Sequence, residues 1–170
     1  LPGSYDNGSE VCHDCAAGTV QPDAAMSACI TCNPGFFNTG TDEICTACES
    51  GSVQPSPSQT SCTSCIVGKY ENASTLEVCL DCPRGRVQPA PSRTSCTACG
   101  SGKYDNIISE ECVDCAAGFS QASQEKTSCD ACAVGTVQPD LGQTTCVDCA
   151  VGQFDDGATE SCSTRSWISP

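Results

Sequence analysis

The chain has 170 residues, of which 19 are cysteine, and its 21 acidic and 7 basic side chains give a net charge of −14. Cysteine at this density, with only 4 Phe, 3 Tyr and 1 Trp, indicates an oxidised, extracellular, disulfide-rich chain and not an enzyme with a large apolar core. The acidic surface argues against binding to nucleic acid or anionic lipid, and no apolar run reaches the roughly 18 residues of a transmembrane segment.

A repeat of 16 or 17 residues runs along the chain. Each unit reads C-x-x-G-x-Φ, where Φ is apolar except at Ser120, beside which Phe119 can substitute. Seven or eight residues then lead to the next C-x-x-C pair. The cysteines fall at Cys12 and Cys15, Cys29 and Cys32, Cys45 and Cys48, Cys62 and Cys65, Cys79 and Cys82, Cys96 and Cys99, Cys112 and Cys115, Cys129 and Cys132, Cys146 and Cys149, and the single Cys162.

We expect three segments. Residues 1–14 form a partial first repeat, because Gly3 and Tyr5 fit the pattern without its opening cysteine. Residues 15–162 hold nine tandem repeats. Residues 163–170 are a tail, in which Arg165 stands where the pattern asks for a second cysteine. No leader-like apolar stretch opens the chain, so we expect a mature protein or a piece of a longer one.

Two disulfide schemes fit the spacing. In the rival scheme, first cysteines bond first cysteines and second bond second, as in Cys12 with Cys29, and Cys149 is left over. In the sequential scheme, which we favour, only Cys12 lacks a partner, and that partner would lie directly before Leu1. Spacing alone leaves both open. The sequential pairs are Cys15–Cys29, Cys32–Cys45, Cys48–Cys62, Cys65–Cys79, Cys82–Cys96, Cys99–Cys112, Cys115–Cys129, Cys132–Cys146 and Cys149–Cys162.

Turn-forming residues predict short β-hairpins and no helix of consequence. The aromatic repeats carry turn residues at Asn7-Gly8, Thr39-Gly40 and Asp156-Gly157, whereas the others read Val-Gln-Pro, in which proline keeps strands short. The predicted fold is a small disulfide-rich repeat, an elongated rod of tandem modules of about 17 residues, each stacked on the next as in a solenoid.

Val-Gln-Pro repeats alternate with aromatic repeats from Cys15 to Cys99. If each repeat rotates by about half a turn, one face presents Gln-Pro turns and the other presents aromatic turns. Two Gln-type repeats follow each other at Cys115 and Cys132, so the faces should exchange there.

The tandem C-x-x-C-x-x-G-x-Φ pattern resembles the ephrin-receptor-like cysteine-rich repeat of the growth-factor-receptor cysteine-rich superfamily. The run from Cys65 to Cys79 is also similar to the first module of a tumour necrosis factor receptor cysteine-rich domain, although the second, doubly bridged module of those domains is lacking. The resemblance implies a loop disulfide within each repeat, which supports the sequential scheme. Long uninterrupted arrays of this kind resemble those of extracellular proteins of protists and algae, including mastigoneme proteins.

No metal, cofactor or catalytic residue is expected. The C-x-x-C spacing is close to that of four-cysteine zinc sites, but such sites are more usual in reducing compartments. A thioredoxin-like role needs a βαβ context that is missing, and the lone His13 cannot form a catalytic triad. Calcium at the Cys-x-Asp-Cys aspartates is conceivable, but we favour solvated linker acids. These aspartates are Asp14, Asp81, Asp114 and Asp148.

The sequence contains N-glycosylation sequons at Asn7 and Asn72, each just after the tyrosine of an aromatic repeat. We therefore expect glycans, in an extracellular or cell-surface location. The predicted function is that of a structural repeat protein, a segment of a longer filament or surface protein that acts as a stiff disulfide-laddered spacer or assembly unit. Its partners would be further copies of itself or other extracellular proteins. The alternative is a receptor or adhesion ectodomain that binds a protein ligand.

Overall fold

The computed structural model describes residues 2–6, 8, 11–74, 76–155 and 161–164. Within these ranges the chain has no helix and folds as ten separate two-stranded antiparallel hairpins. The hairpins belong to two compact units, Leu1–Asp81 with Ala90–Ser95 and Cys82–Pro89 with Cys96–Pro170. None of the described residues forms a helix that could cross a membrane.

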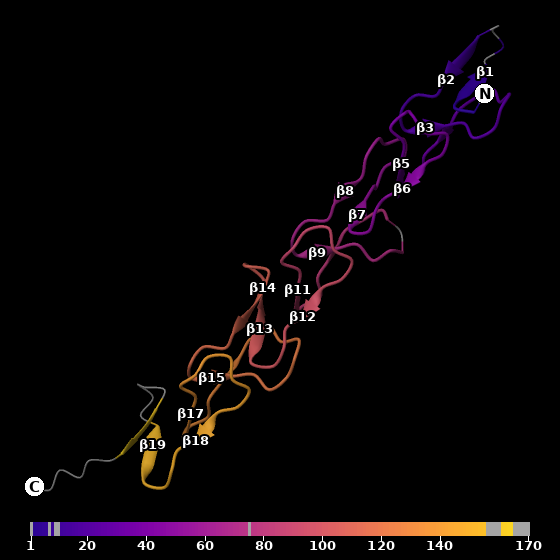
Figure 1. Ribbon diagram of the computed structural model, residues 1–170. Helices are drawn as coiled ribbons and strands as arrows, with labels where there is room; N and C mark the ends of the chain where they lie inside the picture. Colours follow the sequence, from indigo (N-terminus) through magenta and orange to yellow (C-terminus); the bar gives the residue numbers. More distant parts are fainter. Residues whose placement is uncertain (1, 7, 9–10, 75, 156–160, 165–170) are drawn as a thin grey trace, which may run out of the picture. The chain divides into compact units, whose positions relative to one another are not determined.

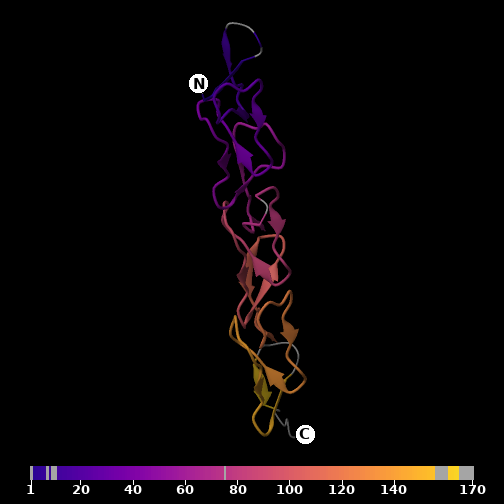
Figure 2. The ribbon, with the colours of Figure 1, turned by 90° about the vertical axis from the view of Figure 1, so that its right-hand side faces the viewer.

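The first unit holds five hairpins, which follow one another in chain order in both ribbon views (Figures 1 and 2). Their strands are β1 (Ser4–Asp6), β2 (Cys12–Asp14), β3 (Thr19–Val20), β4 (Ile30–Thr31), β5 (Phe36–Phe37), β6 (Thr46–Ala47), β7 (Ser52–Val53), β8 (Thr63–Ser64), β9 (Lys69–Tyr70) and β10 (Leu80–Asp81).

The second unit holds the other five hairpins. Their strands are β11 (Arg86–Val87), β12 (Thr97–Ala98), β13 (Lys103–Asn106), β14 (Glu111–Asp114), β15 (Phe119–Ser120), β16 (Asp130–Ala131), β17 (Thr136–Val137), β18 (Val147–Asp148), β19 (Gln153–Asp155) and β20 (Cys162–Thr164). The β13–β14 hairpin is the longest, with four residues in each strand, and belongs to an aromatic repeat without proline. The absence of proline does not by itself give a longer ladder, because the proline-free repeat of β9 and β10 has two residues in each strand.

All ten hairpins share one register. The residue after the repeat glycine pairs with the residue before the second-cysteine position, and Φ pairs with the residue before that one. In one repeat, for example, Lys69 is opposite Asp81 and Tyr70 is opposite Leu80. The backbone N–H of the second cysteine donates to the carbonyl of the glycine, as from Cys65 to Gly51 at 2.9 Å. Each hairpin is therefore closed by two or more pairs of ladder residues.

Nine sequential disulfides close the repeats, with Cα–Cα distances of 5.3 to 5.8 Å. Each joins the second cysteine of one C-x-x-C pair to the first cysteine of the next, across 13 or 14 residues. The predicted fold class, a disulfide-rich tandem repeat of β-hairpins without helices, is confirmed.

The core of each repeat is small and partly polar. The valines at Φ are 3 to 8% exposed, and second cysteines such as Cys32 and Cys65 are fully buried. The side chains that follow Φ are buried as well, including Gln21 and Gln54 at 0 and 8% exposure. These side chains point into the repeat and satisfy backbone groups there. The arrangement of Gln-Pro turns and aromatic turns on two faces stays a prediction.

Backbone hydrogen bonds join each repeat to the next inside a unit. In the first unit, Gly18 N donates to Asn38 O at 2.8 Å, and Asn38 N donates to Gln59 O at 3.0 Å. In the second unit, Gly102 N and Gln121 N donate in the same way to Gln121 O and Gln143 O, at 2.7 and 3.0 Å. Each repeat therefore depends on backbone hydrogen bonds with its neighbour, because its own core is small.

A second set of contacts reaches across two repeats. A Cβ on Gly18 would overlap the carbonyl of Ser58, and its distance to Ser58 Cα would be 3.0 Å. Gly18 and Ser58 both have left-handed backbone conformations, with φ of +82° and +58°. The same relation recurs between Gly51 and Ser92, Gly85 and Glu125, and Gly102 and Gly142. Close backbone packing therefore accounts for the repeat glycine at these positions.

Candidate functional site

A polar side chain directly after Φ is buried in eight successive repeats. These residues are Gln21, Asn38, Gln54, Glu71, Gln88, Asp105, Gln121 and Gln138, none more than 8% exposed. Sequence reasoning missed their role, although the signal was present. An amide or carboxylate follows Φ in every repeat, which a freely varying surface position would not show.

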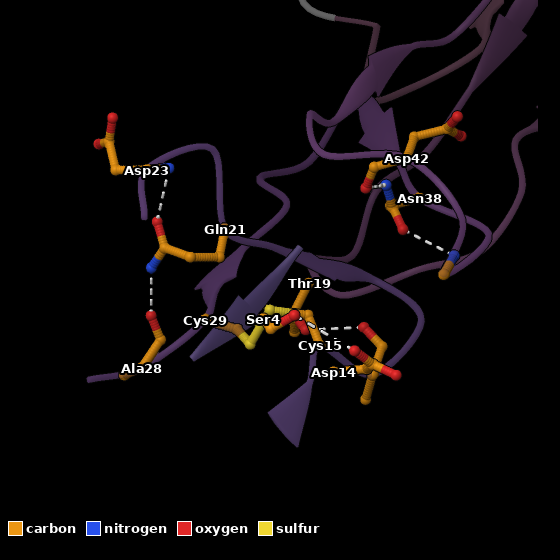
Figure 3. The surroundings of a disulfide bond; sticks show 12 residues. Ser4, Asp14, Cys15, Thr19, Gln21, Asp23, Ala28, Cys29, Asn38 and Asp42 are labelled. Carbon is orange, nitrogen blue, oxygen red and sulfur yellow. Dashed lines mark hydrogen bonds between the residues drawn. A yellow bond between two sulfur atoms is a disulfide. The ribbon is translucent and has the colours of Figure 1, made fainter. Parts of the chain in front are cut away.

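The buried glutamines form hydrogen bonds to backbone groups of the turn that follows them. Gln54 Nε2 donates to Ser61 O at 2.6 Å, and Gln54 Oε1 accepts from Ser56 N at 3.1 Å. Figure 3 shows the same pair of bonds at Gln21, to Ala28 O and from Asp23 N. Gln121 makes the same pair of bonds although alanine follows it, so the amide satisfies the turn backbone with or without a proline.

Two repeats use a buried carboxylate instead. Glu71 Oε1 accepts from Ala73 N, and its Oε2 accepts from Gly51 N of the preceding repeat at 3.4 Å. Asp105 Oδ2 accepts from Gly85 N at 3.1 Å in the same way. In other repeats the glycine N–H donates to a backbone carbonyl, so the carboxylates provide the same inter-repeat bond from a side chain.

Replacement of Gln54 by alanine should destabilise its repeat by about 2 kcal/mol, because Ser61 O and Ser56 N lose their partner. Amide hydrogen exchange of the β7–β8 hairpin, compared with that of the hairpins before and after it, measures the effect. Gln59→Ala is the matched control, since Gln59 lies in the same loop but its exposed side chain donates only to the nearby Pro57 O, and the substitution keeps its backbone carbonyl. Equal exchange in both variants would contradict the role of Gln54.

The Cys-x-Asp-Cys aspartates lie on the hairpins as cross-strand partners. Asp81 forms an ion pair with Lys69, and Asp114 Oδ1 lies 2.6 Å from Lys103 Nζ. Asp14 Oδ1 accepts a hydrogen bond from Ser4 Oγ at 3.3 Å (Figure 3). No group of three or more potential ligands for a metal ion occurs among the residues that the structure describes.

Each unit contains one of two grooves that are lined by residues from equivalent positions. The first, about 360 Å³, is lined by Tyr5, Asp14, Ala16, Thr19, Ala28 and Cys29. The second, about 370 Å³, is lined by Tyr104, Val113, Asp114, Ala116, Phe119, Thr127, Ser128 and Cys129. We call them the Tyr5 groove and the Tyr104 groove. Each has a tyrosine at Φ, an aspartate before the second cysteine and an alanine after it.

The central part of the chain matches a known family. Residues 68–109 and 102–142 match the family described as tyrosine-protein kinase ephrin type A/B receptor-like. This part of the chain carries ephrin-receptor-like cysteine-rich repeats. Ephrin-receptor-like repeats of this kind are non-catalytic modules typical of extracellular proteins, and their disulfides point to an oxidising, extracellular location. No curated protein sequence matches the chain.

Among the predicted glycosylation sites, Asn72 lies on an ephrin-receptor-like repeat in an exposed turn. Its Oδ1 accepts from Ser74 N at 3.1 Å, and Ser74 Oγ donates to Asn72 O at 3.4 Å. The other predicted site, Asn7, lies outside the described residues. Both sites stay predictions.

Cys12 is exposed, and no disulfide joins it to another described residue. Its hairpin has the register of the bridged repeats, since Asp6 is opposite Cys12 as Asp105 is opposite Cys112. A partner directly before Leu1 stays a prediction. His13, beside Cys12, is exposed, and its ring centroid lies 5.6 Å from that of Tyr5.

Proposed function

We propose that the chain is a structural segment of a longer extracellular filament or cell-surface protein. It acts as a stiff, disulfide-laddered spacer or assembly unit, with residues 1–14 as a partial repeat, 15–162 as nine repeats and 163–170 as a tail. The observation that carries the proposal is the bonding of each repeat to its neighbour and its packing against the second repeat along. Both occur in each unit.

These contacts support stiffness because they restrict bending between repeats. Bending at one junction would break bonds such as Gly35 N to Gln54 O at 2.7 Å, and would also separate Gly18 from Ser58. The disulfide inside each repeat prevents the repeat from relieving this strain by local unfolding. A spacer needs these properties, whereas it needs no enclosed catalytic pocket.

The resemblance to mastigoneme-type arrays favours a filament, and electron microscopy of the native material tests this. We expect filaments that antibodies against the repeats label along their length. Labelled single particles or evenly labelled cell surfaces without filaments would contradict the filament role. A spacer role would then be tested by the distance at which the labelled repeats hold a neighbouring domain from the membrane.

Glycosylation at Asn72 follows from an extracellular location. After expression in a eukaryotic secretory system, peptide-N-glycosidase should increase the mobility of the chain on a gel. Asn72→Gln and Ser74→Ala should each remove one glycan, while Asn106→Gln, outside any sequon, should remove none. Unchanged mass in the Asn72 and Ser74 variants would show that the site is not used. An Asn7→Gln variant tests the second site separately.

A receptor or adhesion ectodomain is the second candidate. The Tyr5 and Tyr104 grooves favour it, because exposed aromatic side chains beside a carboxylate can anchor a protein ligand.

A further inference from the structure

We propose that the Tyr5 and Tyr104 grooves bind arginine side chains of a basic extracellular protein segment. This role adds ligand binding to the proposed spacer and does not depend on it. A spacer without such binding remains a spacer, and binding without filaments would favour the adhesion role.

The two grooves are built from equivalent sequence positions. Each begins with a tyrosine at Φ and continues with C-x-D-C-A-A-G, at residues 12–18 in one unit and 112–118 in the other. The next repeat supplies the residue after its glycine, Thr19 or Phe119, and the residue before its closing cysteine, Ala28 or Ser128. Because the same positions form a groove in two separate units, the groove is a property of the sequence pattern.

The lining fits a long side chain with a planar cation at its end. The tyrosine ring, the alanine and the disulfide give an apolar wall, and the Asp14 or Asp114 carboxylate lies in the same groove. An arginine stem packs on such a wall while its guanidinium stacks on the ring and bonds the carboxylate. In the Tyr104 groove, Phe119 is 41% exposed and offers a second ring face.

Charge complementarity favours a basic partner over a second copy of the chain. Residues 1–81, which include the Tyr5 groove, hold 10 acidic side chains and a single basic one, Lys69. The whole chain has a net charge of −14, so two copies repel each other while a basic segment is attracted. Each groove is also open to solvent, which suits the side chain of an extended segment better than a fully enclosed small molecule.

The residue opposite the groove aspartate differs between the two grooves, so we expect their affinities for an arginine peptide to differ. Lys103 already lies against Asp114 in the Tyr104 groove, at 2.6 Å. The equivalent residue beside Asp14 is the neutral Ser4. We therefore expect the Tyr5 groove to bind an arginine peptide more tightly than the Tyr104 groove.

NMR of the isotope-labelled 170-residue chain tests the proposal, with acetylated and amidated Gly-Arg-Gly-Arg-Gly as the probe. We expect the ring signals of Tyr5 and Tyr104 to shift on titration, with tighter binding at Tyr5 and weakening as salt rises. Tyr70 and the exposed Asp140 report binding elsewhere. Shifts at acidic residues throughout, without the tyrosine rings, would show diffuse charge attraction and overturn the proposal.

Single substitutions separate the groove from general acidity. Asp14→Asn should weaken binding at Tyr5 by about fivefold and leave the Tyr104 signals unchanged, since an exposed ion pair is worth up to roughly 1 kcal/mol. Tyr5→Leu should have an effect of similar size, about fivefold, through the lost cation–π contact. Asp148→Asn is the matched control, because Asp148 has the same place in Cys-x-Asp-Cys but follows a repeat with Val137 at Φ.

Three results would overturn the assignment. Equal weakening by Asp148→Asn and Asp14→Asn would remove the special role of the groove. Unchanged ring signals with the arginine peptide would exclude arginine binding. Ring shifts with N-acetylglucosamine trisaccharide, but not with the peptide, would make the groove a saccharide site. Backbone amide signals of the β1–β2 and β3–β4 hairpins, unchanged by Asp14→Asn or Tyr5→Leu before peptide is added, show that these variants are folded around the Tyr5 groove.

Discussion

Replacement of Gly18 by alanine is expected to open the first unit locally, whereas the same replacement at Gly135 should cost far less. Both glycines stand in the sequence G-T-V-Q-P-D, with φ of +82° and +86°. A Cβ at position 18 would overlap the Ser58 carbonyl, while one at position 135 would meet no described atom within 4 Å. The pair therefore separates backbone strain from inter-repeat packing.

The strain of an alanine at positive φ should cost about 1 to 2 kcal/mol at either position. At Gly18 the overlap should add about 3 kcal/mol or more, because the Ser58 backbone cannot move aside without strain on its N–H bond to Cys32 O at 2.9 Å. Hydrogen exchange at Cys32 N, which donates to Gly18 O, and at Ser58 N, which donates to Cys32 O, reports the opening. Similar losses in the two variants would show that the contact across two repeats contributes little to stability.

Reduction of the disulfides is expected to unfold the chain, and a zinc chelator is expected to leave it unchanged. Each bridge closes a loop of 14 or 15 residues and should contribute about 3 kcal/mol through the entropy of the unfolded chain. The described residues include only short strands and a thin core of valines and cysteines, which cannot replace nine such contributions. Amide exchange before and after each treatment measures the result.

Removal of one bridge provides the internal control for this experiment. Cys65→Ala with Cys79→Ala should increase exchange in the β9–β10 hairpin and at Ser92 N, which donates to Cys65 O. The β3–β4 hairpin, three repeats away, should change less, because its contacts run to other repeats. Retained protection after full reduction would mean that packing alone holds the fold. Loss of structure with the chelator would require a metal site.

The sequence predicted the hairpins because these depend on local spacing and turn residues. Spacing left two disulfide schemes open, and the structure has the sequential scheme that we favoured, as in the bridge from Cys65 to Cys79. The burial of the residue after Φ was not predicted, since Gln54 and Glu71 have the composition of surface residues. Their burial depends on carbonyls and amide groups of the next turn or the previous repeat, which only the folded backbone places nearby.

The grooves could not be predicted for a related reason. Tyr5 and Asp14 are recognisable in the sequence, but Ala28 comes from the following repeat. Its position depends on how two hairpins stack. The Cys-x-Asp-Cys aspartates illustrate the same limit. Their spacing allowed calcium or solvent, whereas the hairpin register places Asp81 opposite Lys69, where an ion pair forms.

The contact between alternate repeats has a consequence for how such genes lengthen. Each repeat glycine contacts the second repeat after its own. If a single repeat were duplicated or deleted, that second repeat would be of the other type for every nearby glycine. In two of the four contacts both partners are Val-Gln-Pro repeats, and the approaching residue is Ser58 or Ser92. In a third, a Val-Gln-Pro repeat meets the repeat that reads Ser120-Gln121-Ala122 at this place, and the approaching residue is Glu125. In the fourth, an aromatic repeat meets a Val-Gln-Pro repeat, and the approaching residue is Gly142. Duplication of repeats two at a time preserves every match, so evolution should favour even steps in array length and place a glycine wherever an odd step occurred.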